Sequence, residues 1–317
     1  MKSSKQYARL FLVAIFVTCT SAIIGFEFIG LEAVARLGED LVTLKYGGRL
    51  TWFGLLGHPI KGPSVIIVLY AIALTLFLII DKKRIIDIFL LFLASASLLV
   101  LCFLSGSRGP LGALIIYMVA VFFLQVIVQS SRHKWLVILG GITVCMVAYA
   151  TLNSFLDVEG AVIGFISKAD SHRLILWSIV LDNVSENLWF GAGIATEFID
   201  TKAGAALAAH FGSNMHHAHN LFMHLLVMAG LLGILLFLVF LFLLIKKLII
   251  SPISGLHKAY TYFFLLLMLL LHATEGYRLI SSPGADWVVV WLPLFFILGF
   301  AMEQSAHNVK RKISENE

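Results

Sequence analysis

Long apolar runs alternate with short polar segments along most of the chain. Eight runs are each long enough to cross the hydrocarbon core of a bilayer with modest tilt: 9–27, 64–80, 85–104, 110–128, 135–152, 220–245, 259–275 and 287–303. This pattern predicts an all-α polytopic membrane protein with about eight transmembrane helices, built as a single membrane domain over residues 1–317. The first run is predicted to be a retained helix that also acts as the insertion signal, because no clear small-residue cleavage site follows it.

The composition also indicates a membrane protein. Of the 317 residues, 60% are hydrophobic and 13% are charged, and the mean hydropathy is +0.97. The net charge of +5 does not indicate nucleic-acid binding, because Lys and Arg form short clusters between apolar runs. Cys19, Cys102 and Cys145 all lie inside apolar runs, which indicates small core residues rather than a disulfide framework.

The basic clusters predict how the chain is oriented in the membrane. If eight helices cross, five clusters fall on one side: Lys2/Lys5/Arg9, Lys82/Lys83/Arg84, Arg132/His133/Lys134, Lys246/Lys247 with Lys258, and Lys310/Arg311/Lys312. Loops rich in Lys and Arg stay on the cytoplasmic side. Both termini are therefore predicted to be cytoplasmic.

The opposite face then carries the remaining polar segments, which are 28–63, the turn 105–110, the large loop 153–219 between the fifth and sixth helices, and 276–286. Arg108, Arg173, Arg278 and the histidine cluster share this face and can converge on one substrate. Within the large loop, residues 170–181 are predicted to form a short amphipathic helix, capped by Asp170 or Ser171. This helix is apolar enough to lie on the outer leaflet or dip into it.

Histidines gather where the sixth apolar run begins. A helix is predicted to start near His219, just after His216 and His217. His224 is the polar residue inside that helix. Imidazoles are costly in lipid, which favours a water-filled cavity or a contact with another helix. The positive end of the helix dipole disfavours imidazolium, so a histidine here would stay neutral and able to accept a proton. A polar collar or a zinc site are the alternatives, but the acidic residues of the loop are not spaced as ligand pairs, so no metal is predicted.

Two arginines on this face suggest an anionic ligand. Arg173 falls in the first turn of the short helix, where the helix dipole disfavours a cation unless an anion binds beside it. Arg108 falls in a turn of small and polar residues that suggests a cavity. The alternatives are snorkelling of Arg108 to the membrane interface and contact of Arg173 with lipid phosphates. Gly191 and Gly193 either let backbone N–H groups approach a phosphate or form an ordinary turn.

Together, four motifs resemble the O-antigen ligase and polymerase superfamily, which also contains bacterial protein O-oligosaccharyltransferases. They are the loop from Gly48-Arg49 to His58-Pro59, the turn Ser105-Gly106-Ser107-Arg108-Gly109, the helix from Arg173 to Trp177 with Gly191-Ala192-Gly193 after it, and His219-Asn220 opening a helix that contains Gly230-Leu231-Leu232-Gly233. The resemblance covers residues 45–300. Asn187 stands where the family more often has proline. The family usually has more spans, so family helices at the amino-terminal end are predicted to be missing.

The resemblance implies glycan transfer in the periplasm, at the bacterial inner membrane, from undecaprenyl diphosphate to an acceptor sugar hydroxyl, with no cofactor. It implies that His219 is the general base and that Arg108 and Arg173 clamp the diphosphate leaving group. Further contacts with the substrates are expected from seven residues: Arg49, His216, His217, Asn220, Gly191, Gly193 and Arg278. Asn220 would also orient His219 or cap the helix.

The acceptor distinguishes three activities within this family. Transfer to lipid A-core makes a ligase, transfer to another lipid-linked repeat makes a polymerase, and transfer to a protein hydroxyl makes an oligosaccharyltransferase. Residues 274–279 and 286–293 resemble ligase-like members slightly more, so lipid A-core is the preferred acceptor. A lipid-linked glycan transporter is an alternative of another class, but it predicts charges near the bilayer midplane and paired repeats with interrupted helices.

Overall fold

The computed structural model describes residues 2–28, 58, 60–79, 84–128, 173–184, 187–212, 215–274, 279 and 284–316. Within these ranges the protein is helical and has no strand, which confirms the all-α prediction. Seven helices in the described ranges are long and apolar enough to cross a membrane. They are α1 (Lys2–Phe28), α3 (Lys61–Ile79), α4 (Ile85–Leu104), α5 (Arg108–Val128), α10 (Leu221–Ile250), α11 (Gly255–Thr274) and α12 (Ala285–Asn316).

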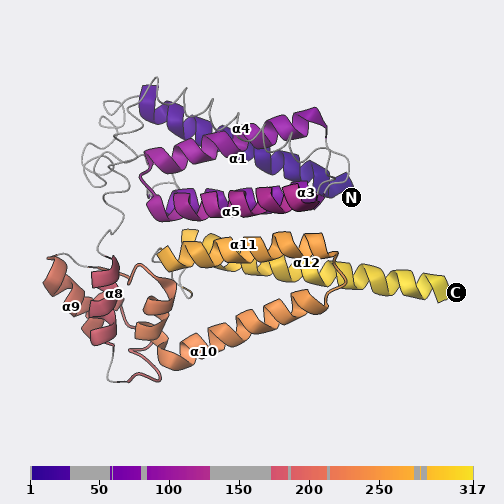
Figure 1. The fold of residues 1–317 in the computed structure, drawn as a ribbon. Coiled ribbons are helices and arrows are strands. Elements are labelled where there is room, and N and C mark those ends of the chain that lie inside the picture. Colours follow the sequence, from indigo (N-terminus) through magenta and orange to yellow (C-terminus); the bar gives the residue numbers. More distant parts are fainter. Residues whose placement is uncertain are drawn as a thin grey trace.

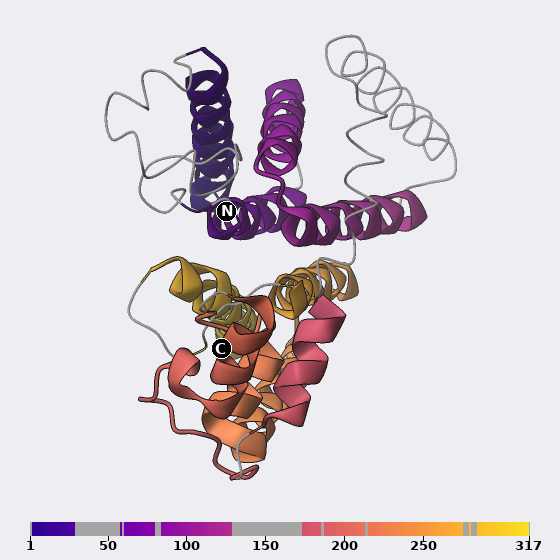
Figure 2. The ribbon, with the colours of Figure 1, turned by 90° about the vertical axis from the view of Figure 1, so that its left-hand side faces the viewer.

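These seven helices correspond to seven of the eight predicted spans, and the span predicted at 135–152 lies outside the described residues. The helices lie in two groups, with α1, α3, α4 and α5 in one and α10, α11 and α12 in the other (Figure 1). Both chain termini lie at one end of the molecule. The short helices α8 (Arg173–Asp182) and α9 (Lys202–Phe211) lie at the other end, beside the α10 group (Figures 1 and 2).

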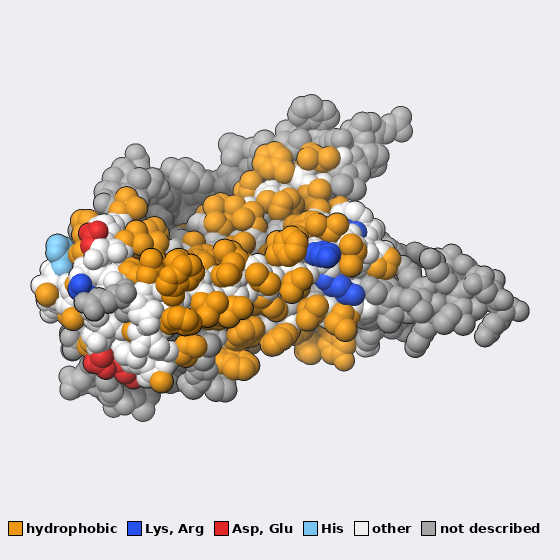
Figure 3. Space-filling view, turned by 90° about the horizontal axis from the view of Figure 1, so that it is seen from below, with side chains coloured by type: hydrophobic (Ala, Val, Ile, Leu, Met, Phe, Trp, Pro, Cys, Tyr) orange, Lys and Arg blue, Asp and Glu red, His pale blue; other side chains and the backbone are white. Residues whose placement is uncertain are grey.

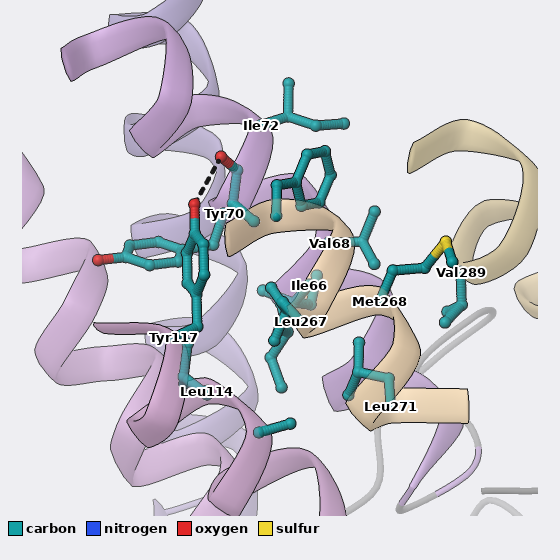
Figure 4. Packing of buried hydrophobic residues seen from close by; sticks show 14 of the residues in the cluster. Ile66, Val68, Tyr70, Ile72, Leu114, Tyr117, Leu267, Met268, Leu271 and Val289 are labelled. Carbon is teal, nitrogen blue, oxygen red and sulfur yellow. Dashed lines mark hydrogen bonds between the residues drawn. The ribbon is translucent and has the colours of Figure 1, made fainter. Parts of the chain in front are cut away.

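Helix α3 is the most buried long helix and joins the two groups. Its sequence is apolar on all sides, which is typical of a helix surrounded by protein, and it contacts α1, α4 and α5 as well as α11 and α12. Ile66 and Val68 of α3 pack in one cluster with Leu114 of α5 and Leu267 of α11 (Figure 4). In a bilayer, close packing of this kind, rather than transfer of apolar groups out of water, holds helices together.

Polar side chains add specific links between the helices. The Tyr70 and Ser95 hydroxyls lie 2.7 Å apart and join α3 to α4. Lys61 Nζ of α3 donates to Asp286 Oδ1 of α12 over 2.7 Å. Two further links are Arg9 with Asp87, between α1 and α4, and Gln125 with Tyr260, between α5 and α11. Such pairs fix the register of packed helices because a polar group left alone in hydrocarbon is costly.

The outer surface of the long helices is hydrophobic, as a membrane-facing surface must be. Figure 3 shows a broad apolar surface, with Lys and Arg gathered mainly toward the end away from α8 and α9. Arg84 and Lys246 are exposed at that end, which is the end predicted to be cytoplasmic. Asp182 and Asp200 are exposed at the end that carries α8 and α9.

The segment before α10 contains more structure than the sequence predicted. The short helix expected at 170–181 corresponds to α8, whose predicted caps, Asp170 and Ser171, lie outside the described residues. A 3-10 turn, η2 (Phe198–Asp200), and helix α9 follow it and were not predicted. The Thr201 side chain caps α9 by accepting from Gly204 N at 3.0 Å, and Gly212 ends the helix with φ 65°.

Candidate active site

Asn220 fixes the beginning of α10. Its Oδ1 accepts hydrogen bonds from Phe222 N at 2.8 Å and Met223 N at 3.1 Å, which is N-cap geometry. Its Nδ2 donates to Ala273 O at 3.1 Å, near the carboxyl end of α11. The helix therefore begins at Leu221, slightly later than predicted, and His219 lies just before the cap, where α10 meets α11.

His219 has an unusual backbone. Its φ is 50°, in the left-handed region that residues with a side chain seldom adopt. A conformation of this kind costs about 1–3 kcal/mol and persists only where the surrounding structure enforces it. The Asn220 cap supplies that constraint from one side, so the direction of the His219 side chain is set by the fold.

Three groups surround the His219 imidazole. The His217 ring packs against it edge-on, with the ring centroids 4.2 Å apart. Arg173, at the start of α8, and His58, just before α3, both act on it electrostatically. Burial, followed by these two groups, lowers the pKa of His219 from 6.5 to about 4. The ring is therefore neutral at pH 7 and can accept a proton.

His58 comes from a part of the chain remote from the other site residues. Its Nδ1 accepts from Ile60 N at 3.2 Å and from Lys61 N at 3.3 Å, so it caps the start of α3. In the sequence, His58 stands out only as part of the end of a loop motif. A histidine followed by proline immediately before an apolar helix was the signal that could have identified it.

Helix α8 places Arg173 beside His219, and Trp177 lies one turn further along the same helix. The two residues are four positions apart and share one face of the helix. Leu176 and Val180 hold this helix in place by packing in a cluster with Met228 of α10. The Trp177 Nε1 atom is buried and has no hydrogen-bond partner among the described residues, which makes it a candidate donor to a substrate.

Helix α10 is broken at Gly230, whose φ of 66° and ψ of −164° are not helical. At the break, the loop 188–193 takes over two bonds of the helical ladder. Leu231 N donates to Leu188 O at 2.9 Å instead of to Val227 O, and Val227 O accepts from Ala192 N at 2.8 Å. The next pair does the same, with Leu232 N bonded to Trp189 O at 3.1 Å and Gly193 N bonded to Met228 O at 2.9 Å.

Two glycines allow this loop to approach the helix so closely. A Cβ at Gly230 would lie 2.4 Å from the Trp189 carbonyl, and a Cβ at Gly191 would lie 2.7 Å from the backbone of residues 228–230. Gly191 N bonds to Asn187 O at 2.8 Å, so the amides of residues 191, 192 and 193 all donate to backbone carbonyls. These amides are not available to a phosphate in this structure, which corrects that reading of Gly191 and Gly193. The glycines join the loop to α10.

A pocket of about 160 Å³ lies beside the break. One wall is the segment that follows the loop, including Thr196, Glu197 and Phe198, and the other is the first part of α10, including His224 and Met228. The rings of Phe198 and His224 lie 5.2 Å apart. The pocket was not predicted, because its walls meet only through the loop and the broken helix.

The remaining predicted residues lie as follows. Arg108 begins α5 at the end of the molecule that carries α8 and α9, after a turn in which Gly106 has φ 61°. His216 is exposed and His217 is half-buried. Arg49 and Arg278 lie outside the described residues. Within the described ranges no three His, Cys, Asp or Glu side chains come together as metal ligands would.

The part of the chain that the structure describes contains seven long apolar helices, which indicates a multi-pass membrane protein. A polar site that includes His219, Arg173 and a pocket lies at one end of these helices. Residues 89–238 match the family described as O-antigen ligase. This match agrees with the resemblance that the four sequence motifs indicated, and it supports an enzyme in general. No curated protein matches the chain.

The matched stretch runs from α4 to just past the break in α10. It contains Arg108, Arg173, Gly191 and Gly193, together with the whole histidine cluster at 216–219. His58, Lys61 and Asp286 lie outside it. The matched region therefore includes His219 and Arg173, and His58, just before α3, lies outside it.

Proposed function

We propose that this protein transfers a glycan from undecaprenyl diphosphate to lipid A-core on the periplasmic face of a bacterial inner membrane. The observation that carries the proposal is the neutral, largely buried His219 beside the Arg173 guanidinium, inside the stretch that matches the O-antigen ligase family. A neutral imidazole can remove a proton, and a guanidinium binds a diphosphate with paired hydrogen bonds.

His219 acts as the general base in this proposal. Its free ring nitrogen takes the proton from an acceptor hydroxyl while that oxygen attacks the anomeric carbon of the donor sugar. The bond from the anomeric carbon to the diphosphate oxygen breaks, and the bonding electrons leave with undecaprenyl diphosphate. The His219 proton is later released to water.

Arg173 has two roles in the same step. Its positive charge helps to keep His219 neutral before the reaction, and it offsets the negative charge that grows on the leaving diphosphate. Arg108 is the proposed second half of the clamp, because it begins α5 at the same end of the molecule. The remaining substrate contacts are proposed for His216, His217 and Asn220, with Arg49 and Arg278.

The position of α8 supports a donor that arrives from the membrane. Leu174, Ile175 and Leu181 are exposed and apolar on this helix, which suits a helix lying in the outer leaflet beside the lipid tail of the donor. A polymerase or a protein O-oligosaccharyltransferase would use the same donor chemistry with another acceptor. A transporter would also use interrupted helices, and α10 is interrupted, but the family match favours glycan transfer.

The test is a lipopolysaccharide gel run in parallel with analysis of undecaprenyl-linked glycan, in cells that lack the gene. Cells carrying the intact gene should attach long glycan to lipid A-core, whereas cells carrying His219→Ala should accumulate it on the carrier. His210→Ala is a matched control, because His210 is an exposed histidine on α9 at the same end. Lipid A-core with a single repeat after deletion would indicate a polymerase, and full attachment by His219→Ala would exclude the base assignment.

Arg173→Lys tests the proposed clamp. Lysine retains the charge but loses the planar pair of donors, so kcat should fall at least about tenfold with normal amounts of protein in the membrane. Unchanged turnover would show that Arg173 contributes charge alone. Arg108→Lys gives the same test for the second arginine.

A further inference from the structure

We infer that the pocket beside the break in α10 binds one uncharged sugar unit of the acceptor. This inference rests on the proposed function, because it assigns the acceptor side of the same site. The pocket holds about 160 Å³, and the break in α10 at Gly230 lies just beyond its lining residues Met228 and Ala229. Leu221, two residues after His219, is part of its wall, so the pocket and the proposed base share the beginning of α10.

The pocket is a built feature, because the loop that forms one wall is fixed at several points. The two crossed pairs of backbone bonds attach residues 188–193 to α10. Thr196 then continues the turn, with its N donating to Gly193 O at 3.1 Å and its Oγ1 donating to Ala192 O at 2.8 Å. Phe198 is buried against the rest of the α8 and α9 cluster. The wall at 194–198 is therefore held at a set distance from α10 before any ligand arrives.

The lining suits the two kinds of surface on a sugar ring. Glu197 supplies a carboxylate, which can accept hydrogen bonds from two neighbouring hydroxyls, and His224 supplies an imidazole from the opposite wall. Phe198, Leu225 and Met228 supply apolar surface on which the C–H face of a sugar can pack. A lipid tail could not hydrogen-bond to the Glu197 carboxylate, whereas a sugar could both hydrogen-bond to it and pack on the apolar side chains.

The charges separate this pocket from the proposed diphosphate site. Glu197 is the charged side chain among the described lining residues, and a carboxylate repels a phosphate. Arg173 lies on the His219 side, where the diphosphate is proposed to bind. The anionic head group of the donor therefore binds at Arg173, and a neutral sugar of the acceptor binds at Glu197.

Binding can be measured without transfer, on the purified full chain carrying His219→Ala. The probe is a fluorescently labelled neutral hexose oligosaccharide, compared with the same oligosaccharide bearing one phosphate. Glu197→Gln should weaken binding of the neutral probe roughly tenfold or more, because it removes a charged hydrogen-bond acceptor. Asp200→Asn is the matched control, since Asp200 is an exposed carboxylate three residues away that does not line the pocket. It should leave binding unchanged.

The phosphorylated probe should bind the parent protein more weakly than the neutral probe, and Glu197→Gln should reduce that difference. Three results would each overturn the inference. They are no binding of the neutral probe to the protein that carries only His219→Ala, equal binding of that probe after Glu197→Gln is added, and a preference for the phosphorylated probe. Binding of undecaprenyl diphosphate should be unaffected by Glu197→Gln and weakened by Arg173→Ala. If binding of the neutral probe depends on Glu197 but the lipopolysaccharide test shows no glycan transfer, the sugar site is supported. That result would count against the proposed reaction only.

Discussion

At the scale of single residues, His219 combines three features that seldom occur together. Its backbone is in the left-handed region, its ring is largely buried, and its neighbours are a guanidinium and two other imidazoles. Each feature has a cost in stability, and together they hold an uncharged base at one place. A residue that only lined a surface would not need any of them.

The lowered pKa of His219 predicts how activity depends on pH. The acidic limb of kcat/KM should have its midpoint near 4, where the buried ring takes up a proton, and not near the ordinary value of 6.5. Transfer at pH 5.5 should therefore retain most of its rate at pH 7.5. The measurement is kcat/KM for a fixed donor across this range, and a midpoint near 6.5 would show that His219 is not the titrating base.

The same shift predicts a loss of stability in acid. Between about pH 6.5 and 4, His219 binds a proton in the unfolded chain but not in the folded one, so the free energy of unfolding falls as the pH is lowered through this range. His219→Gln should reduce that dependence. Thermal unfolding of both proteins in detergent at pH 7 and pH 5 measures it, and parallel curves would contradict the prediction.

Trp177 offers a second test at this scale. Trp177→Phe keeps an aromatic ring but removes the buried Nε1 donor, which has no partner among the described residues. If substrate is the partner, kcat/KM should fall about tenfold while Tm stays unchanged or rises, because an unsatisfied buried group is lost. Unchanged kcat/KM would exclude the donor role, and a large fall in Tm would indicate a structural role.

The sequence indicated His219 and Arg173 as candidate site residues because His219 stands at the start of a predicted helix and Arg173 lies in the first turn of another, where a cation is unusual. His58 was not identified as a site residue, although it acts electrostatically on His219. Its place beside them depends on how α3 packs against α11 and α12, and no local pattern encodes that packing. The low pKa of His219 was expected from the helix dipole, but burial is its largest cause.

At the scale of elements, the long apolar helices were predictable because a bilayer demands apolar runs of a certain length. The break in α10 was not, because Leu231 and Leu232 continue the apolar run without interruption. The cause is a loop about forty residues earlier in the chain, which replaces two backbone bonds of the helix. Hydropathy records which residues avoid water, and it does not record which carbonyl accepts from which amide.

Gly230→Ala tests the break. An added Cβ would lie 2.4 Å from the Trp189 carbonyl, and the φ of 66° is unfavourable for alanine. We expect the loop to detach, with a loss of about 3 kcal/mol or more in stability, loss of transfer, and faster proteolysis between residues 187 and 197. Gly112→Ala is the control, because a Cβ there meets nothing within 4 Å, and alanine favours a helix. Equal stability of the two variants would argue against the close contact.

At the scale of the whole molecule, the two ends differ in chemistry. One end carries both termini and exposed Arg84 and Lys246, and the other carries α8, α9 and the site. The positive-inside rule assigns the first end to the cytoplasm. The site would then face the periplasm, where the proposed lipid-linked donor would present its glycan.

Cysteine labelling tests this orientation in a protein whose three native cysteines are replaced. Asp200 and Lys246 are both exposed and lie at opposite ends. A membrane-impermeant maleimide should label Asp200→Cys in intact spheroplasts and Lys246→Cys only after permeabilisation. The reverse pattern would place the proposed active site in the cytoplasm and exclude a periplasmic transfer.

An uninterrupted α10 would join Leu231 to Val227 and Leu232 to Met228 through its own ladder, so a straight helix satisfies these groups without help. The bent helix satisfies them only when residues 188–193 are in place, and an unsatisfied backbone group in hydrocarbon costs several kcal/mol. We therefore expect α10 to enter the membrane as a straight helix during biosynthesis and to bend when residues 188–193 fold onto it. The pocket would be completed in that last step, so the enzyme matures after insertion rather than during it.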